Sequence, residues 1–61
     1  MSTREFFLRY LGDINFLLQE YENAAEYYKT LLSEFKNNKT RTNLAYLNAL
    51  EYLTYSRLCH E

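Results

Sequence analysis

The chain has 61 residues, so it holds at most one small domain, and a domain of this size buries only about 60% of the surface that its unfolded chain exposes. Seven basic residues against eight acidic ones give a net charge of −1, which provides no electrostatic drive toward nucleic acid or an anionic membrane. With a single cysteine there is no internal disulfide, so we expect a partner or a longer parent chain to supply the missing stability and the chain to be a fragment.

Proline is absent and glycine occurs once, a composition that favours helices over strands and tight turns. The first helix is expected over residues 3–19, because Ser2 and Glu5 have the spacing of a capping box. Its main apolar stripe is expected at Phe7, Leu11, Ile14 and Leu18. Further apolar residues widen this stripe, so the helix needs cover on more than one side.

The second helix is expected over residues 21–36, where one face is apolar and the opposite face is charged. The apolar face comprises Tyr21, Ala24, Ala25, Tyr28, Leu31, Leu32 and Phe35. An Asn-rich segment then interrupts the pattern, and a third helix is expected over residues 40–59. Short loops make sequential helices antiparallel neighbours. The sequence therefore predicts an all-α fold, an antiparallel helical hairpin with a third helix, forming one segment of an α-solenoid over residues 1–61.

The hairpin resembles one tetratricopeptide repeat over residues 5–36, with a Leu-Gly pair in the first helix, an aromatic residue at the turn and a small residue early in the second helix. The residues expected to pack within this repeat are Leu11, Gly12, Phe16, Tyr21, Ala24, Tyr28 and Leu31. Because Gly12 and Ala24 lack bulk, we expect the two helices to cross at their level. Three residues depart from the usual tryptophan, second alanine and final proline of the repeat: Leu8, Leu31 and Lys36.

A second resemblance is narrower, and it rests on seven segments: Arg9–Asp13, Phe16–Leu18, Glu20–Glu22, Ala24-Ala25, Tyr28, Glu34–Lys39 and Leu44-Ala45. Together they are similar to a helical-repeat stretch in the Trs85-type large subunits of the transport protein particle (TRAPP). The resemblance implies a role in vesicle tethering, Golgi traffic and autophagy. It also implies a cytoplasmic location, with contact to Golgi or autophagic membranes only through a larger complex.

No set of residues has the spacing of a catalytic or metal site. Cys59 and His60 are adjacent, and neighbours on a helix point about 100° apart, so they cannot form a nucleophile–base pair. A structural zinc site needs about four Cys or His ligands. Paired carboxylates perform acid–base chemistry only inside a cleft that shifts a pKa, and three helices suggest no such cleft. We therefore expect neither an enzyme nor a cofactor.

The apolar surface left over on the first and third helices favours a protein–protein interaction scaffold. The outward residues expected to contact a partner are Leu8, Tyr10, Leu17, Tyr46, Leu50 and Leu53, and the basic loop residues Lys36, Lys39 and Arg41 are expected to add a polar contact. The alternative function is a small self-associating bundle that serves as an oligomerisation, accessory or regulatory domain. The partner is accordingly another protein or a second copy of the chain, with no nucleic acid and no transmembrane segment expected.

Overall fold

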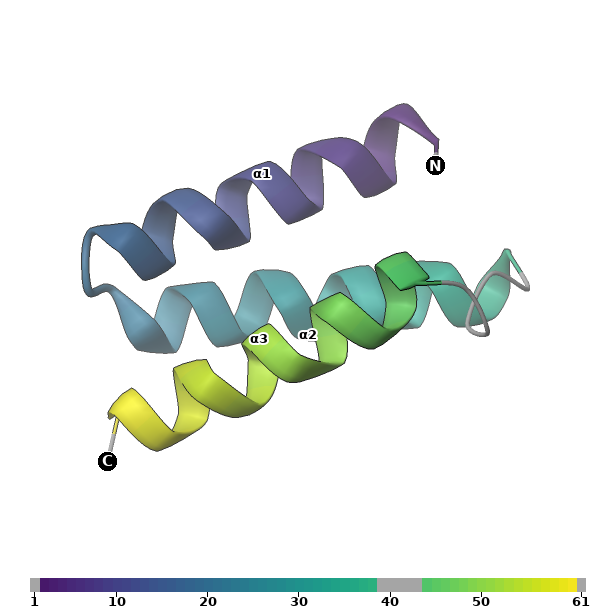
Figure 1. The fold of residues 1–61 in the computed structure, drawn as a ribbon. Helices are drawn as coiled ribbons and strands as arrows, with labels where there is room; N and C mark the ends of the chain where they lie inside the picture. The colour runs from purple at the N-terminus through teal and green to yellow at the C-terminus, as the bar shows by residue number, and fades with distance from the viewer. Residues whose placement is uncertain (1, 39–43, 61) are drawn as a thin grey trace.

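The structure, a computed structural model, describes residues 2–38 and 44–60, and all of its regular elements in these ranges are helices. They are α1 (Thr3–Leu17), α2 (Tyr21–Asn37) and α3 (Leu44–His60). Figure 1 shows α1 and α3 running in the same direction along α2, which is antiparallel to both. The all-α prediction and the hairpin with a third helix are confirmed. The expected start of the third helix at residue 40 lies outside the described residues, and its end at 59 falls one residue short.

The N-terminus of α1 is fixed by the capping box that the sequence predicts. The backbone N–H of Glu5 donates to Ser2 Oγ at 3.2 Å, and the backbone N–H of Ser2 donates to Glu5 Oε1 at 2.8 Å. These two bonds satisfy donors that have no partner inside the helix. The first turn of α1 is thereby closed by its own side chains.

The C-terminus of α1 lies two residues before the predicted one. Gln19 adopts φ 63°, in the left-handed region, and its backbone N–H donates to the Phe16 carbonyl at 3.0 Å. The backbone N–H of Glu20 donates to the Asn15 carbonyl at 2.8 Å. These two bonds form a Schellman motif, which ends α1 at Leu17 and lets α2 begin at Tyr21. The predicted end near residue 19 is two residues late, because glycine, the usual signal of this motif, is absent here.

The core runs along α2, which is the only described helix in extensive contact with two others. Its buried residues, spaced by four, three and four, are Ala24, Tyr28, Leu31 and Phe35. Leu53 of α3 packs with Ala24 and Tyr28 in one cluster, and Ala49 packs with Leu31 and Phe35 in the other. Burying one large apolar side chain contributes about 1.5–3 kcal/mol, so these clusters are the main support of the fold.

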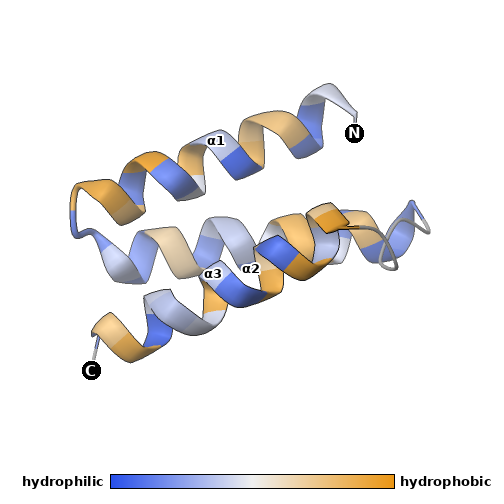
Figure 2. Ribbon diagram, viewed as in Figure 1, coloured by the Kyte–Doolittle hydropathy of each residue, from blue (hydrophilic) through white to orange (hydrophobic). Residues whose placement is uncertain are grey.

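The face of α1 that packs on α2 is not the predicted one. The buried residues of α1 are Glu5 and Gly12, whereas Phe7, Leu11 and Leu18 are 55%, 37% and 68% exposed. Gly12 lies opposite the ring of Tyr28, and only a residue without a side chain lets α1 approach this ring closely. Gly12 therefore determines which face of α1 points inward. Figure 2 shows hydrophobic residues along the whole of α1, including its side away from α2. Because α1 carries apolar residues on several sides, its most regular apolar stripe is not the one that packs on α2.

Candidate functional site: two outer helix faces and the network that positions them

The contact that sets the distance between α1 and α2 joins Gly12 to Tyr28. A Cβ atom placed on Gly12 would lie 2.6 Å from Tyr28 Cε1, well inside the ~3.5–4.0 Å of an ordinary carbon–carbon contact. The close approach expected at Gly12 is present, but the atoms nearest to it belong to Tyr28, one helical turn beyond Ala24.

The structure places most of the predicted repeat-packing residues in or beside the core. Ala24, Tyr28 and Leu31 are fully buried. Phe16 and Tyr21 are half-buried and pack edge to face, with ring centroids 5.4 Å apart. Leu11 is the exception, because it lies on the outer side of α1. Its predicted place in the hairpin interface was wrong for the same reason as the rest of its stripe.

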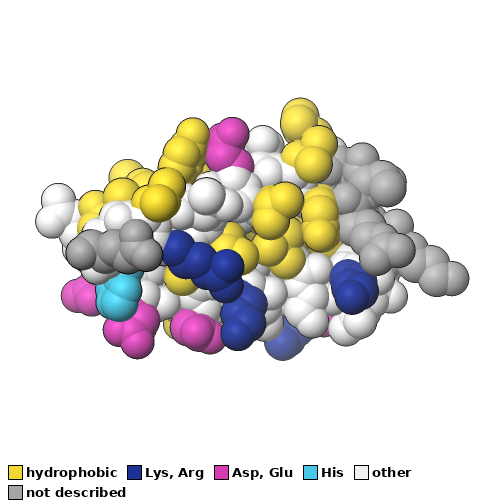
Figure 3. Space-filling view, turned by 90° about the horizontal axis from the view of Figure 1, so that it is seen from below, with side chains coloured by type: hydrophobic (Ala, Val, Ile, Leu, Met, Phe, Trp, Pro, Cys, Tyr) yellow, Lys and Arg dark blue, Asp and Glu magenta, His cyan; other side chains and the backbone are white. Residues whose placement is uncertain are grey.

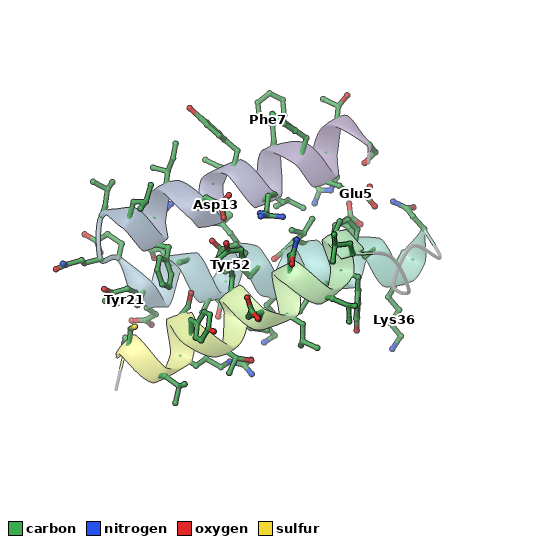
Figure 4. The ribbon with its side chains drawn as sticks, in the orientation of Figure 1. Glu5, Phe7, Asp13, Tyr21, Lys36 and Tyr52 are labelled. Atoms are coloured by element: carbon green, nitrogen blue, oxygen red, sulfur yellow. The ribbon has the colours of Figure 1, made fainter. Side chains whose placement is uncertain are left out.

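A polar network joins the three helices near their middle. Tyr28 Oη donates to Asp13 Oδ1 at 2.6 Å, and Arg9 Nε lies 3.2 Å from Asp13 Oδ2. The guanidinium carbon of Arg9 lies 5.2 Å from the ring centroid of Tyr52, which packs on the Tyr28 ring at 5.8 Å. Figure 4 shows Asp13 and Tyr52 in the space between the helices. Arg9 and Tyr52 thus link α1 to α3, and Tyr28 links both of them to α2.

The electrostatics of this network are those of a structural site. Burial, and then the hydrogen bond to the Asp13 carboxylate, raise the pKa of Tyr28 far above its usual value, so the hydroxyl remains a donor. A shallow hollow of about 280 Å³ adjoins the network and is lined by Asp13, Phe16, Leu17, Tyr28 and Tyr52. The sequence alone assigned no partner to Asp13. The four-residue spacing of Arg9 and Asp13 was the signal that could have revealed their pairing.

A second polar contact closes the other end of the hairpin. Asn38 Nδ2 donates to Glu5 Oε2 at 2.7 Å, and Arg4 forms an ion pair with Glu34. The hydrogen bond from Asn38, followed by the one from the Ser2 backbone, lowers the pKa of the Glu5 carboxyl below its usual value. Glu5 thus remains ionised although its side chain is buried. No sequence pattern links residues 5 and 38, so this contact could not be foreseen.

The outer face of α1 is a surface of apolar side chains. Among the predicted contact residues, Tyr10 is 52% and Leu17 is 80% exposed, whereas Leu8 is half-buried against the core. Phe6 stacks on Tyr10 with ring centroids 6.5 Å apart. A shallow groove of about 400 Å³ on the same helix is lined by Thr3, Arg4, Phe7, Leu8 and Leu11. Figure 4 shows Phe7 pointing away from the other helices.

The outer face of α3 is a second apolar surface, and its exposed large residues are Leu44, Leu47, Leu50, Tyr55 and Leu58. Leu50, a predicted contact residue, is 43% exposed. Tyr46 is half-buried, and its ring lies 6.3 Å from that of Phe35. Leu53 is only 5% exposed, so its predicted position on an outer face was wrong. Leucine and alanine occur all around this helix, so the side that meets α2 could not be read from the sequence.

Charged side chains are separated along the underside of the molecule. Figure 3 shows acidic side chains and the histidine toward one end of this face, basic side chains toward the other, and hydrophobic ones above them. His60 Nε2 lies 3.5 Å from Glu22 Oε2. Lys36 is exposed and points away from the helices (Figure 4). The other two predicted basic contacts, Lys39 and Arg41, lie outside the described residues.

The described residues meet the requirements of neither a metal site nor a membrane-spanning helix. Within residues 2–38 and 44–60, no three His, Cys, Asp or Glu side chains are grouped to hold a metal ion. Among the helices in those ranges, none is both long and apolar enough to cross a membrane. Cys59 is exposed, and His60 contacts Glu22.

An all-α fold with two exposed apolar helix faces and a structural polar network is typical of a protein that is built into an assembly. Comparison with protein families agrees with this class. The family described as the ER–Golgi trafficking TRAPP I complex 85 kDa subunit matches residues 1–61, and the chain belongs to this family. No curated protein and no solved structure matches the chain. The narrower of the two predicted resemblances is thereby confirmed, while the tetratricopeptide repeat stays a prediction.

Proposed function

We propose that this chain is a protein-interaction scaffold within a TRAPP-type ER–Golgi trafficking complex, and that α3 contacts another subunit of the complex. The family match over the whole chain supports the complex. The observation that supports the contact is the exposed apolar stripe of α3, because soluble proteins rarely leave such a surface uncovered. The chain then reaches Golgi membranes, or autophagic membranes, only through the complex.

The proposed contact is a four-turn stripe along the outer side of α3, formed by Leu44, Leu47, Glu51, Tyr55 and Leu58. Its four apolar members are 71%, 55%, 46% and 62% exposed in chain order. A stripe with steps of three and four residues packs against one helix of a partner at a shallow crossing angle. The exposed Glu51 carboxylate lies at its centre, so the complementary partner helix carries a Lys or Arg at the opposing position.

The proposed hairpin geometry supports a rigid scaffold. The predicted tetratricopeptide arrangement would account for the contact of Gly12 with Tyr28 and for the aromatic pair Phe16–Tyr21 at the turn. Leu50 is exposed beside the α3 stripe, and Lys36 is exposed at the end of α2. These two residues would form the rim of the contact. Such a scaffold holds a partner helix without changing its own shape.

The test is co-expression of the chain with the remaining TRAPP I subunits, followed by purification through a tag on the chain. We expect the parent chain to co-purify with a defined subunit, and Leu47→Glu to reduce the recovered subunit at least ~10-fold because it places a charge in a desolvated seam. Glu51→Lys should also weaken the complex by removing the charge complementarity. Lys29→Glu, a charge change at an exposed position of α2, is the matched control and should leave recovery unchanged. Absence of any TRAPP subunit, or equal recovery with Leu47→Glu, would contradict the proposal.

A further inference from the structure

The outer face of α1 differs from that of α3 in one respect: its apolar stripe has no charged member. The stripe consists of the exposed Phe7 and Leu11, the half-buried Ile14 and, directly after the end of α1, the exposed Leu18, spaced by four, three and four residues. This spacing is symmetric about its midpoint. When two copies of α1 lie antiparallel about a two-fold axis, Phe7 of each copy faces Leu18 of the other, and Leu11 faces Ile14. We propose that a second copy of this chain docks on the outer face of α1 in this register.

Charges at the two ends of α1 complement each other in the same register. Arg4 is exposed near the start of the helix, and Glu20 is exposed just after its end. Antiparallel pairing brings Arg4 of one copy to the level of the turn that contains Glu20 of the other, and it does so twice because the interface is two-fold symmetric. Arg4 also reaches the C-terminal end of the opposite α1, where the helix dipole favours a cation. Arg4 also forms an ion pair with Glu34 of its own chain, and a guanidinium has enough donors to be shared between Glu34 and the second copy.

The area of the face suits a weak, reversible dimer. Phe6, Phe7 and Tyr10 are each more than half exposed, and Leu17 and Leu18 are 80% and 68% exposed. With about 150–250 Å² for an aromatic side chain and roughly 100 Å² for a leucine, these residues and Leu11 expose on the order of 500–600 Å². When the flanking residues Phe6, Tyr10 and Leu17 are covered together with the stripe, a dimer buries at most about 1,000–1,200 Å² in total, at the lower end of specific interfaces.

Two alternatives are less favourable than a second copy on α1: self-pairing of the chain through α3, and binding of α1 to a membrane. The α3 stripe is also symmetric, but its centre is Glu51, so antiparallel self-pairing would oppose two carboxylates at the two-fold axis. A membrane-bound helix of this kind usually carries several Lys or Arg beside its apolar face. The chain as a whole has a formal net charge of −1. The two outer faces therefore have different occupants, a second copy on α1 and a heterologous helix on α3.

The test is sedimentation velocity of the 61-residue chain from about 10 µM to about 1 mM, with a reductant that keeps the exposed Cys59 from cross-linking. We expect reversible dimerisation, and a rise of at least ~10-fold in the dimer dissociation constant for Phe7→Glu. Leu47→Glu is the matched control on α3 and should leave the dissociation constant unchanged, whereas it disrupts the contact in the proposed function. The helical content of each variant, measured by circular dichroism, must equal that of the parent chain.

A charge exchange tests the register independently of the apolar residues. Arg4→Glu and Glu20→Lys should each weaken the dimer at least ~3-fold, and the double variant should recover the affinity, because it restores both cross-pairs in reversed order. A chain that stays monomeric over the whole range overturns the proposal. A dimer whose dissociation constant is unchanged by Phe7→Glu also overturns the proposal. A double variant that dimerises no more tightly than its single variants overturns the antiparallel register.

Discussion

Replacing Gly12 by alanine should destabilise the fold, although alanine is the better helix former. The new Cβ would lie 2.6, 2.8 and 2.9 Å from three atoms of the Tyr28 ring. Relief of this overlap requires α1 and the ring to separate by about 1 Å, since carbon atoms normally approach to ~3.5–4.0 Å. The ring cannot move freely, because it is buried and its hydroxyl is bound to Asp13.

The magnitude follows from two opposing effects. Helix propensity favours alanine over glycine by about 1 kcal/mol in a helix interior. Overpacking a close contact costs about 1–3 kcal/mol, and displacement of the ring also lengthens a charge-assisted hydrogen bond, which adds about 1 kcal/mol at a carboxylate that is partly solvated. We therefore expect a net loss of about 1–3 kcal/mol, which for a domain of ~60 residues lowers Tm by roughly 4–24 °C. Gly12→Leu should cost at least as much.

The assay is urea unfolding followed by circular dichroism, carried out in three backgrounds at one protein concentration. Gly12→Ala should destabilise the parent chain and the Tyr28→Phe variant, because both keep the ring. In the Tyr28→Leu background the overlapping ring atoms are absent, and the same change should be neutral or stabilising by up to about 1 kcal/mol. If Gly12→Ala stabilises all three backgrounds equally, the reasoning from the Gly12–Tyr28 contact is refuted.

Three other substitutions test separate parts of the structure by the same assay. Gln19→Gly should stabilise the chain by about 0.5–1 kcal/mol, since Gln19 has φ 63° and only glycine adopts that region without strain; equal stability would argue against the Schellman geometry. Leu53→Ala should cost about 2–5 kcal/mol at a buried position, whereas Leu58→Ala should cost less than ~0.5 kcal/mol at an exposed one. The pKa of Glu5 is lowered on folding, so its ionised form stabilises the protein above the ordinary glutamate pKa of about 4.3, and this contribution is lost as the pH falls through the folded pKa. Stability of the parent chain should therefore fall more steeply on acidification than that of Glu5→Gln, and parallel curves would show that the Asn38–Glu5 contact is unimportant.

The sequence was sufficient for the features that local chemistry determines. The capping box of Ser2 and Glu5 has a fixed spacing, and α2 has a polar face that leaves only one side for the core. The buried positions Ala24, Tyr28 and Leu31 could therefore be predicted by number. Family membership was predicted from segments of both hairpin helices and the loop after them.

The features that could not be read from the sequence depend on how the helices pack against one another. In α1 and α3, apolar residues occur on all sides, so which stripe is inward depends on the fit to α2. For α1, the close approach to α2 at Gly12 decides the fit and turns Leu11 outward. For α3, packing on α2 buries Leu53 and leaves Leu50 exposed. The contact of Glu5 with Asn38 joins positions 33 residues apart, and no local pattern signals it.

The central position of α2 has a consequence for how the chain opens. Both α1 and α3 rest mainly on α2, and they touch each other at few points, among them the ring contact of Phe16 with Tyr52. Either outer helix can therefore detach while the other stays docked, whereas α2 cannot unfold without releasing both. Partial opening of this kind makes amide hydrogens of α1 and α3 exchange with solvent at a lower free-energy cost than those of α2. A partner that covers one outer helix would slow exchange in that helix and leave the opposite helix free to open.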